Sequence, residues 1–298
     1  MSQPQSETEF APVDRAKIAA RLRRILPPEA VLDNEEDLRP YECDGLSAYR
    51  ELPLLVALPD SVEQVQAIMR LCHALEVPVV ARGAGTGLSG GALPHRSGVL
   101  LSLAKFKQIL EIDTRRQVAR VQPGVRNLAI SEAADPFGLY YAPDPSSQIA
   151  CTIGGNVAEN SGGVHCLKYG LTVHNIQALK VVSVEGELLS IGGSGLDAPG
   201  YDLLALMTGS EGMLGIIVEV TVKLLAKPQR AQVLLAAFDD LTKAGAAVGD
   251  IISAGIIPAG LEMMDRPAIR AAEDFVHAGY PLDAEAILLC ELDGTNEE

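Results

Sequence analysis

The residues with the clearest chemical potential are the glycines at positions 83, 85, 87, 90 and 91, which follow a short run rich in valine at 77–80. A loop this rich in glycine adopts positive φ angles and brings bare backbone N–H groups close to a ligand. N–H groups arranged in this way hold phosphate in many proteins. The loop at 82–91 is therefore predicted to bind a phosphorylated ligand.

Two other nucleotide-binding motifs compete for the same residues. The spacing of Gly85, Gly87 and Gly90 matches the dinucleotide fingerprint, which requires a helix that starts at the third glycine. Residues 91–98 contain a proline and two glycines instead, so an NAD-binding Rossmann unit is disfavoured. No Lys-Ser or Lys-Thr pair follows the glycines, which argues against a P-loop ATPase. A glycine-rich hairpin without a ligand stays open as an alternative.

Glycine is concentrated in three parts of the chain. Fourteen of the 28 glycines fall within 83–98, 154–170 and 209–215, which together make up 40 of the 298 residues. Each glycine costs backbone entropy on folding. This clustering is easier to explain if the three segments converge on one extended ligand than if each is a separate surface turn.

The second glycine segment belongs to a polar stretch at 143–163, where small and hydroxyl-bearing residues dominate. We expect a long loop here, whose backbone and hydroxyl groups would suit a polar, planar ligand. A long Ω-like loop with no ligand is the alternative. Long structureless loops in compact domains are usually functional, which favours the first interpretation.

The composition is that of a globular protein with enough residues for two domains: 48% are apolar and 21% are charged. The net charge of -15 argues against nucleic acid or an anionic membrane as a partner. The five cysteines are scattered and form no C-x-x-C pair, so neither a disulfide framework nor a zinc or iron–sulfur site is indicated, and we predict no metal. No apolar run is long enough to span a membrane, and the N-terminus has no signal region, which predicts a cytoplasmic protein.

The hydrophobic pattern predicts the elements that position these loops. A strand at 52–59 leads to a helix that ends near residue 75 and is started by a capping box of Asp60 and Glu63. The strand at 77–82 then enters the glycine loop. The other predicted elements are helices at 12–26 and 127–134 and strands at 99–103, 117–122, 178–184, 187–190 and 216–225.

The pattern restarts at Val233 and predicts the opening of an α+β domain. Its expected elements are strands at 233–238 and 286–291 and helices at 242–254 and 267–276, with a Pro/Gly break at 258–260. A sheet of two strands is marginally stable unless more strands or another chain complete it. The second domain is therefore expected to be unfinished within these residues.

Three motifs together resemble the FAD contacts of the vanillyl-alcohol oxidase / p-cresol methylhydroxylase superfamily. They are RGAGTGLSGG at 82–91, PDPSS at 143–147 with IGGNVAENSGG at 153–163, and GSEGMLGII at 209–217. The resemblance covers about 51–228. Four further segments resemble the FAD-binding subunit of bacterial glycolate oxidase and its D-lactate dehydrogenase relatives, namely ECDG at 42–45, AYR at 48–50, LEMMDR at 261–266 and GYP at 279–281.

The resemblance implies an α+β fold in which a two-subdomain PCMH-type FAD-binding domain precedes the start of an α+β substrate, or cap, domain. The implied division is an N-terminal helical segment at 1–50, the FAD-binding domain at 51–228 and a partial substrate domain at 229–298. The metal-binding and substrate-binding histidines of the family lie in the C-terminal part of the substrate domain. They are expected beyond residue 298.

Carried over residue by residue, the resemblance implies that 82–91 wraps the FAD pyrophosphate, that 152–163 lines the isoalloxazine and ribityl groups, and that 211–217 contacts the cofactor again. Thr86 stands where some relatives attach the flavin to a histidine, which implies non-covalent FAD. In so acidic a chain, backbone dipoles must supply most of the attraction, with Arg82 the nearest cation. The implied FAD-binding residues are Arg82, Gly83, Ala84, Gly85, Thr86, Gly87, Leu88, Gly91, Pro143, Asp144, Ser147, Thr152, Gly154, Gly155, Asn156, Asn160, Ser161, Gly162, Gly163, Glu211, Gly212, Gly215, Ile216 and Ile217.

The implied function is FAD-dependent oxidation of a small 2-hydroxy acid, glycolate or D-lactate, to the 2-oxo acid. Hydride passes to flavin N5 while a base takes the hydroxyl proton, and the electrons go on to a partner or a quinone. An iron–sulfur electron-transfer subunit and a second flavin-fold subunit are the implied partners, which would hold the protein at the inner membrane from the cytoplasm. The alternative is a flavin-binding fragment or subunit without independent turnover.

The catalytic base is not assigned by the sequence. His165 and His174 follow the second glycine segment and are weak candidates, because a lone histidine there is more often a loop or packing residue. Glu262 is more simply read as a solvated or ion-paired carboxylate. The remaining histidines, His73, His95 and His277, are interpreted as structural or solvated.

Overall fold

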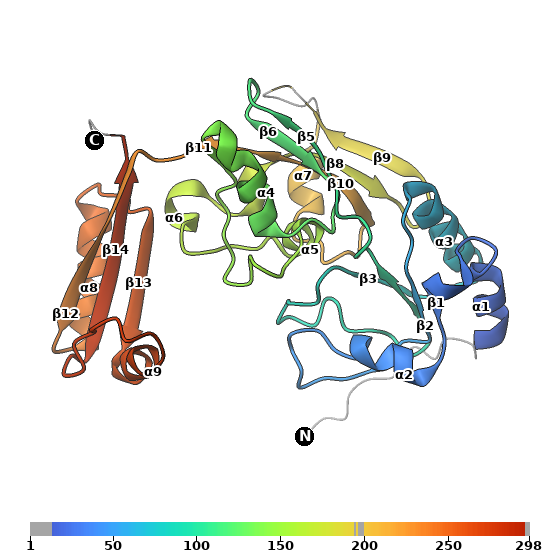
Figure 1. Cartoon of the computed structure of the whole chain (residues 1–298), viewed down its shortest axis with the longest axis horizontal. Helices are drawn as coiled ribbons and strands as arrows, with labels where there is room; N and C mark the ends of the chain where they lie inside the picture. Colours follow the sequence, from blue (N-terminus) through green and yellow to red (C-terminus); the bar gives the residue numbers. More distant parts are fainter. Residues whose placement is uncertain (1–13, 194, 196–199, 296–298) are drawn as a thin grey trace.

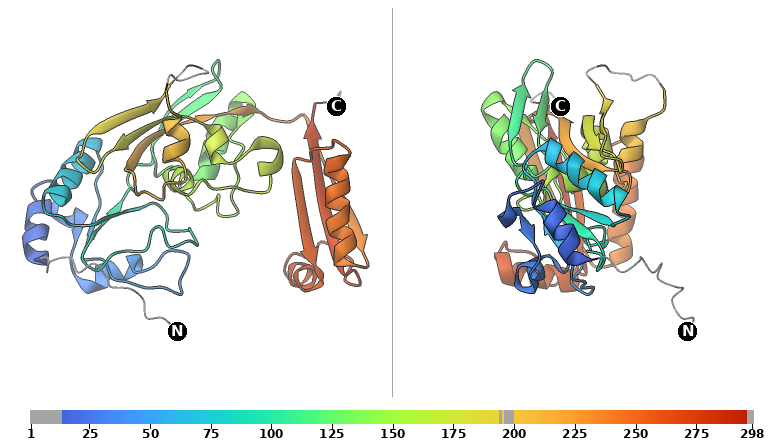
Figure 2. Two further views of the ribbon diagram at one scale, coloured as in Figure 1. Left: turned by 180° about the vertical axis from the view of Figure 1, so that it is seen from behind. Right: turned by 90° about the vertical axis from the view of Figure 1, so that its right-hand side faces the viewer.

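The structure is a computed structural model that describes residues 14–193, 195 and 200–295. Within this part of the chain the strands form four β-sheets, of four, five, two and three strands (Figure 1). The first two sheets belong to adjacent subdomains, and the three-stranded sheet stands apart from them at the C-terminal end (Figures 1 and 2). The implied α+β class therefore matches the arrangement of the elements.

The first subdomain is built on a four-stranded sheet in the order β1-β2-β4-β3. β2, β4 and β3 run parallel, and β1 pairs antiparallel with β2. Its strands are β1 (Val31–Leu32), β2 (Leu55–Ala57), β3 (Val79–Arg82) and β4 (Val99–Ser102), and its helices are α1 (Arg15–Leu22), α2 (Glu35–Leu38) and α3 (Val62–Ala74). Leu22 of α1 and Val65 and Ile68 of α3 are fully buried with the sheet in one core.

The helix predicted after β2 exists, but its start was predicted one residue too early. The N-cap of α3 is Ser61, whose hydroxyl accepts the N–H of Gln64 at 3.3 Å. The side chain of Gln64 in turn accepts the N–H of Asp60 at 2.8 Å. The cap is therefore Ser61 with Gln64 rather than Asp60 with Glu63, because the serine hydroxyl sits at the residue where the backbone leaves extended geometry.

The second subdomain is an antiparallel sheet in the order β5-β6-β10-β8-β9. α4, α5 and α7 bury apolar residues in the core that includes this sheet. The elements are β5 (Ile109–Asp113), β6 (Val118–Val121), α4 (Asn127–Ala134), α5 (Ile153–Glu159), β8 (Ile176–Val182), β9 (Leu188–Gly192), α7 (Leu203–Met207) and β10 (Ile216–Lys223). The helix predicted at 127–134 is confirmed. A short pair, β7 (Leu139–Tyr140) and β11 (Leu225–Ala226), closes the subdomain.

The prediction of a continuous loop at 143–163 was wrong, because this stretch contains α5. Its two glycines give the helix a low intrinsic propensity. Ile153 and Val157 lie one turn apart and are both fully buried in the core that includes β10. Tertiary packing therefore outweighs the local preference.

The C-terminal elements form a three-stranded antiparallel sheet in the order β12-β14-β13. The strands are β12 (Arg230–Phe238), β13 (Gly260–Asp265) and β14 (Ala286–Gly294), and the helices are α8 (Leu241–Ser253) and α9 (Arg266–Val276). The prediction of two strands was wrong, because the residues after the Pro/Gly break pair with β14 over all of β13. No helix in the described residues is both long and apolar enough to cross a membrane.

Candidate functional site

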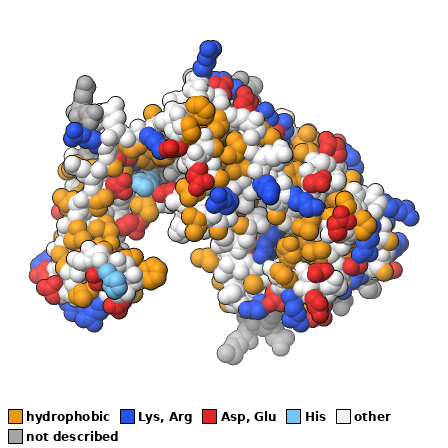
Figure 3. All heavy atoms as spheres, viewed as in Figure 1, with side chains coloured by type: hydrophobic (Ala, Val, Ile, Leu, Met, Phe, Trp, Pro, Cys, Tyr) orange, Lys and Arg blue, Asp and Glu red, His pale blue; other side chains and the backbone are white. Residues whose placement is uncertain are grey.

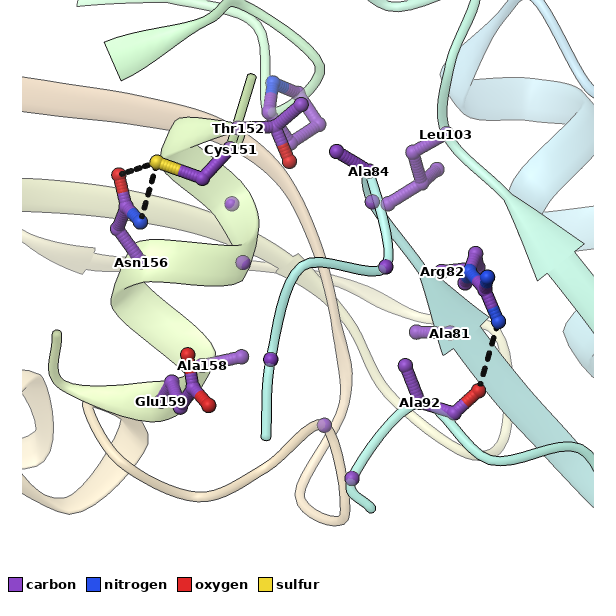
Figure 4. Close-up of a pocket in the computed structure, with 18 of the residues that line it drawn as sticks. Ala81, Arg82, Ala84, Ala92, Leu103, Cys151, Thr152, Asn156, Ala158 and Glu159 are labelled. Atoms are coloured by element: carbon purple, nitrogen blue, oxygen red, sulfur yellow. Dashed lines mark hydrogen bonds between the residues drawn. The ribbon is translucent and has the colours of Figure 1, made fainter. Parts of the chain in front are cut away.

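A cavity lies between the first two subdomains, where the loop after β3, the start of α5 and the turn before β10 meet (Figure 4). All three glycine segments contribute to its wall. Of the residues predicted to bind the cofactor, the cavity is lined by Arg82, Gly83, Ala84, Gly85, Thr86, Gly87, Gly91, Thr152, Gly154, Gly155, Asn156, Glu211, Gly212, Gly215 and Ile217. The structure thus brings together segments that are about 130 positions apart in the sequence.

Nine of the predicted binding residues do not line the cavity in the part of the chain that the structure describes. Leu88 is 69% exposed, whereas Ile216 is buried in the core. Asn160 is the C-cap of α5, and its side chain accepts the N–H of Val173 at 3.0 Å. The complete set is Leu88, Pro143, Asp144, Ser147, Asn160, Ser161, Gly162, Gly163 and Ile216.

Eight further residues line the cavity that had not been predicted as binding residues: Asp44, Ala81, Ala92, Leu103, Pro123, Cys151, Ala158 and Glu159. Asp44 comes from the segment before β2, some forty residues ahead of the glycine loop. The ECDG motif that contains Asp44 indicated the family resemblance but did not predict a binding role for this residue. The neighbouring Gly45 packs so tightly on the glycine loop that a Cβ there would lie 2.7 Å from the carbonyl oxygen of Gly87.

Arg82, at the end of β3, connects this segment to the glycine loop. Its Nη2 donates to the carbonyl of Cys43 at 2.6 Å. Its Nη1 donates to the carbonyl of Ala92 at 3.2 Å (Figure 4). Burial lowers the pKa of the guanidinium, and the charge of Asp44 opposes this. One donor therefore binds the end of the glycine loop and the other binds the segment before β2, so the guanidinium holds the two together.

The wall of the cavity has buried polar atoms that lack a partner. Asp44 is 6% exposed and Thr152 is 8% exposed, yet Asp44 Oδ2 and Thr152 Oγ1 form no hydrogen bond in the described structure. Buried polar groups without partners are rare, and a ligand commonly satisfies them. An elongated ligand with hydroxyl and amide groups, such as FAD, fits these atoms.

The glycines of the loop also keep the wall open. A Cβ at Gly87 would lie 2.9 Å from Glu159 Oε1. Added Cβ atoms would also collide with Thr152 Oγ1 from Gly83 and with Glu211 Oε2 from Gly91. Side chains at these positions would fill the space beside the loop backbone, which a pyrophosphate cradle must leave open.

Three carboxylates and one guanidinium line the cavity: those of Asp44, Glu159, Glu211 and Arg82. Burial raises the pKa of Glu211, and the charge of Glu159 raises it further. Side-chain charge in the cavity is thus mainly negative. Attraction for an anionic ligand must come from backbone N–H groups, in agreement with the expectation from the acidic composition.

His165 lies outside the cavity and is held between two carboxylates. Its Nδ1 is 2.6 Å from Asp144 Oδ2, and its Nε2 is 3.4 Å from Glu291 Oε2. Burial lowers the pKa of His165, but the hydrogen bond and charge of Asp144, together with Glu291, outweigh this effect and raise it above its ordinary value. A histidine paired on both sides is poorly suited to serve as a free base.

Asp144→Asn is expected to lower the pKa of His165, because it removes the negative charge from the 2.6 Å contact. A raised folded-state pKa gives stability that is complete below the unfolded value, about 6.5, and is lost as the pH rises through the folded value. NMR titration of the imidazole signals measures the shift, with the other four histidines as internal controls. An unchanged His165 titration would contradict the assignment. It would mean that the other acids whose charges act on this ring, Glu291 and Asp293, hold its pKa without Asp144.

The other candidate bases are also placed away from the cavity. His174 Nδ1 accepts the N–H of Leu171 at 3.1 Å, which makes it a local structural residue. Glu262 lies on β13 and is exposed. None of the five histidines lines the cavity as described.

Two family models match the chain in sequence. The one described as FAD binding domain matches residues 53–192, and the one described as FAD linked oxidases, C-terminal domain, matches residues 227–298. The cofactor prediction of FAD is thereby confirmed. The mixed helix and sheet fold with a PCMH-type FAD-binding domain is confirmed as well.

Curated proteins and solved structures give consistent matches. Glycolate oxidase subunit GlcD of Escherichia coli (strain K12) is 67% identical over 286 residues, which are 96% of this chain and 57% of that protein. D-lactate dehydrogenase of Anaerostipes hadrus is 36% identical over 281 residues, covering 92% of this chain and 59% of that protein. The structure of p-cresol methylhydroxylase with substrate bound matches with a TM-score of 0.79 and 19% identity, covering 95% of this chain and 61% of that one. The chain thus spans little more than half the length of these relatives.

Proposed function

Because this chain belongs to the FAD-linked oxidases, we propose that it is the FAD-binding part of an enzyme that oxidises a small 2-hydroxy acid, glycolate or D-lactate, to the 2-oxo acid. The substrate class is carried by the names of the two curated relatives. The observation that carries the cofactor site is the convergence of three glycine segments on one cavity with unpartnered polar atoms.

The residues proposed to hold FAD are those predicted residues that line the cavity, together with Asp44. N–H groups of the glycine loop supply fixed dipoles for the pyrophosphate, and Arg82 keeps that loop in shape. Thr152 Oγ1 and Asp44 Oδ2 are available for polar groups of the cofactor. The side chain of Thr86 cannot form the bond by which a histidine at this position attaches the flavin in some relatives, and this supports dissociable FAD.

When bound, FAD supplies the two-electron acceptor that the amino acids lack. The contribution of this chain is to bind and orient the cofactor within a wall shaped by α5 and the glycine loop. We assign the uptake of the hydroxyl proton to no described residue, because the histidines considered for it, His165 and His174, lie outside the cavity.

The domain division proposed from the resemblance is 1–50, 51–228 and 229–298. The start of the C-terminal family match at residue 227 and of β12 at Arg230 supports the second boundary. We also propose an iron–sulfur electron-transfer subunit and a second flavin-fold subunit as partners, which would bring a cytoplasmic protein to the inner membrane. The name of the Escherichia coli relative, a subunit, supports a multi-subunit enzyme.

The substrate proposal is tested with the full-length protein in its FAD-bound form. Anaerobic addition of glycolate, and separately of D-lactate, is expected to bleach the visible flavin absorption, with L-lactate as the stereochemical control for D-lactate. Bleaching by neither acid would contradict the proposed substrate class. The same assay on residues 1–298 tests the alternative of a flavin-binding fragment without turnover, which bleaching of this chain's flavin would contradict.

A further inference from the structure

The FAD-binding domain and the C-terminal sheet approach each other at one end of the C-terminal unit, and a deep hollow separates their lower parts (Figure 3). The contacts between the two come from α6 (Cys166–Tyr169) with the two residues before it, from the backbone of β13 at Gly260, and from side chains of β14. We call residues 164–169 the junction segment. The covalent connection through β11 and β12 lies at the same end (Figure 1).

Two neighbouring residues of the junction segment bind one carboxylate of β14. Lys168 Nζ lies 2.5 Å from Asp293 Oδ1 and donates to the Asp293 carbonyl at 2.7 Å, while the Tyr169 hydroxyl donates to Asp293 Oδ2 at 2.6 Å. The Asp293 side chain is only 5% exposed. Burial raises the pKa of Asp293, but Lys168 and Tyr169 outweigh it and the net pKa is lowered. A buried carboxylate with both oxygens satisfied is a strong, directional contact.

Other contacts anchor the junction segment on both sides. The ring of Tyr169 packs edge to face against Tyr140 of β7, with ring centroids 6.2 Å apart. His165 connects Asp144 of its own domain with Glu291 of β14. Gly260 of β13 lets the sheet approach closely, since a Cβ there would lie 2.8 Å from Val164 Cγ1.

The junction segment is also connected to the cavity wall. It directly follows Gly163, whose added Cβ would collide with Asp144, the partner of His165. α5, which ends four residues before Gly163, lines the cavity with Thr152 and Asn156 close to its start. The same short stretch of chain therefore contacts the C-terminal sheet and shapes the cofactor cavity.

We propose that the junction segment fixes the C-terminal sheet relative to the cofactor cavity, with Lys168 and Tyr169 as positioning residues. The inference rests on the proposed function in one respect: the C-terminal unit is taken to present substrate to the cofactor. The contacts of Asp293 are polar and few, so the arrangement depends on a small number of side chains. Domain interfaces this small usually permit relative motion when their contacts are lost.

The test is small-angle X-ray scattering of the 298-residue chain. Lys168→Met combined with Tyr169→Phe removes every side-chain donor to Asp293 that the structure describes, and is expected to increase the radius of gyration and maximum dimension. The single variant Lys168→Arg keeps both the cation and the Tyr169 hydroxyl, so its scattering profile should match that of the parent. Lys180→Met is the matched control, because its ion pair with Glu219 at 3.1 Å lies within one sheet. If the double variant does not fold, Asp293→Asn is judged by the same criterion.

A folded double variant whose scattering matches the parent would overturn the proposal. Flavin content separates this outcome from failure of the proposed function: a chain that never binds FAD but still expands contradicts the function and leaves the positioning role standing. In the full-length enzyme, Lys168→Met is expected to lower kcat/KM for the 2-hydroxy acid roughly tenfold or more, through misplacement, with FAD content unchanged. If a variant expands but its kcat/KM is unchanged, Lys168 does not act by positioning the C-terminal sheet for catalysis.

Discussion

Gly85→Val is expected to abolish retention of FAD while the protein remains folded. Gly85 has φ of +70°, a conformation that costs a β-branched residue about 1–3 kcal/mol. An added Cβ would also collide with Arg82, the side chain that holds the loop. Distortion of the loop would move its N–H groups away from the pyrophosphate. We expect FAD affinity to fall about 100-fold or more, or about 2.8 kcal/mol, measured by titration followed in the visible spectrum.

The matched control is Gly138→Val. Gly138 has φ of +69°, so the backbone strain is nearly the same, but it lies at the end of a 3-10 helix, is absent from the cavity lining, and has no atom within 4 Å of an added Cβ. This variant is expected to lose some stability and keep its FAD affinity. Equal FAD affinity in the two variants would mean that the loop has been misassigned.

Arg82→Met is expected to reduce both stability and FAD affinity. Arg82 is 7% exposed, and its loss leaves the carbonyls of Cys43 and Ala92 without their charged donor. Hydrogen bonds to charged groups contribute about 1.5–3 kcal/mol each, so the free energy of unfolding should fall by about 3 kcal/mol or more. Asp44 also loses the nearby positive charge. Urea unfolding gives the stability and FAD titration gives the affinity.

Two comparisons isolate the role of the guanidinium. Arg82→Lys retains the charge but not the planar fork, so an intermediate loss is expected. Arg126→Met removes another contact to a carbonyl, that of Ile149 at 3.2 Å, at a more exposed site outside the cavity lining, and should change stability by about 0.5 kcal/mol or less. A loss for Arg126→Met as large as that for Arg82→Met would contradict the assigned role.

The glycine segments could be predicted because their cause is local. A backbone that needs positive φ selects glycine, and this leaves a mark in the sequence at Gly85 and Gly90 alike. Regular elements with long apolar periodicity, such as α3 and β10, were also predictable, because the pattern lies within one segment of the sequence. What a single segment determines can be predicted from that segment.

Features that depend on distant contacts were not predictable. α5 is helical because Ile153 and Val157 are buried in the core, although its glycines disfavour a helix. Asp44 enters the cavity wall because Gly45 packs on the loop around Gly87 and Arg82 binds the Cys43 carbonyl, and both contacts join distant parts of the chain. The pairing of His165 with Glu291 joins positions far apart in the chain, and nothing in the sequence around either residue indicates it.

The most direct test of the central claim is the visible absorption spectrum of the purified 298-residue chain after incubation with FAD and removal of the free cofactor. The account predicts a flavin spectrum, released on denaturation as free FAD, because Thr86 provides no covalent attachment. It also predicts that Gly85→Val, prepared in parallel, is colourless. A folded parent chain that retains no flavin would contradict the assignment of the cavity as an FAD site.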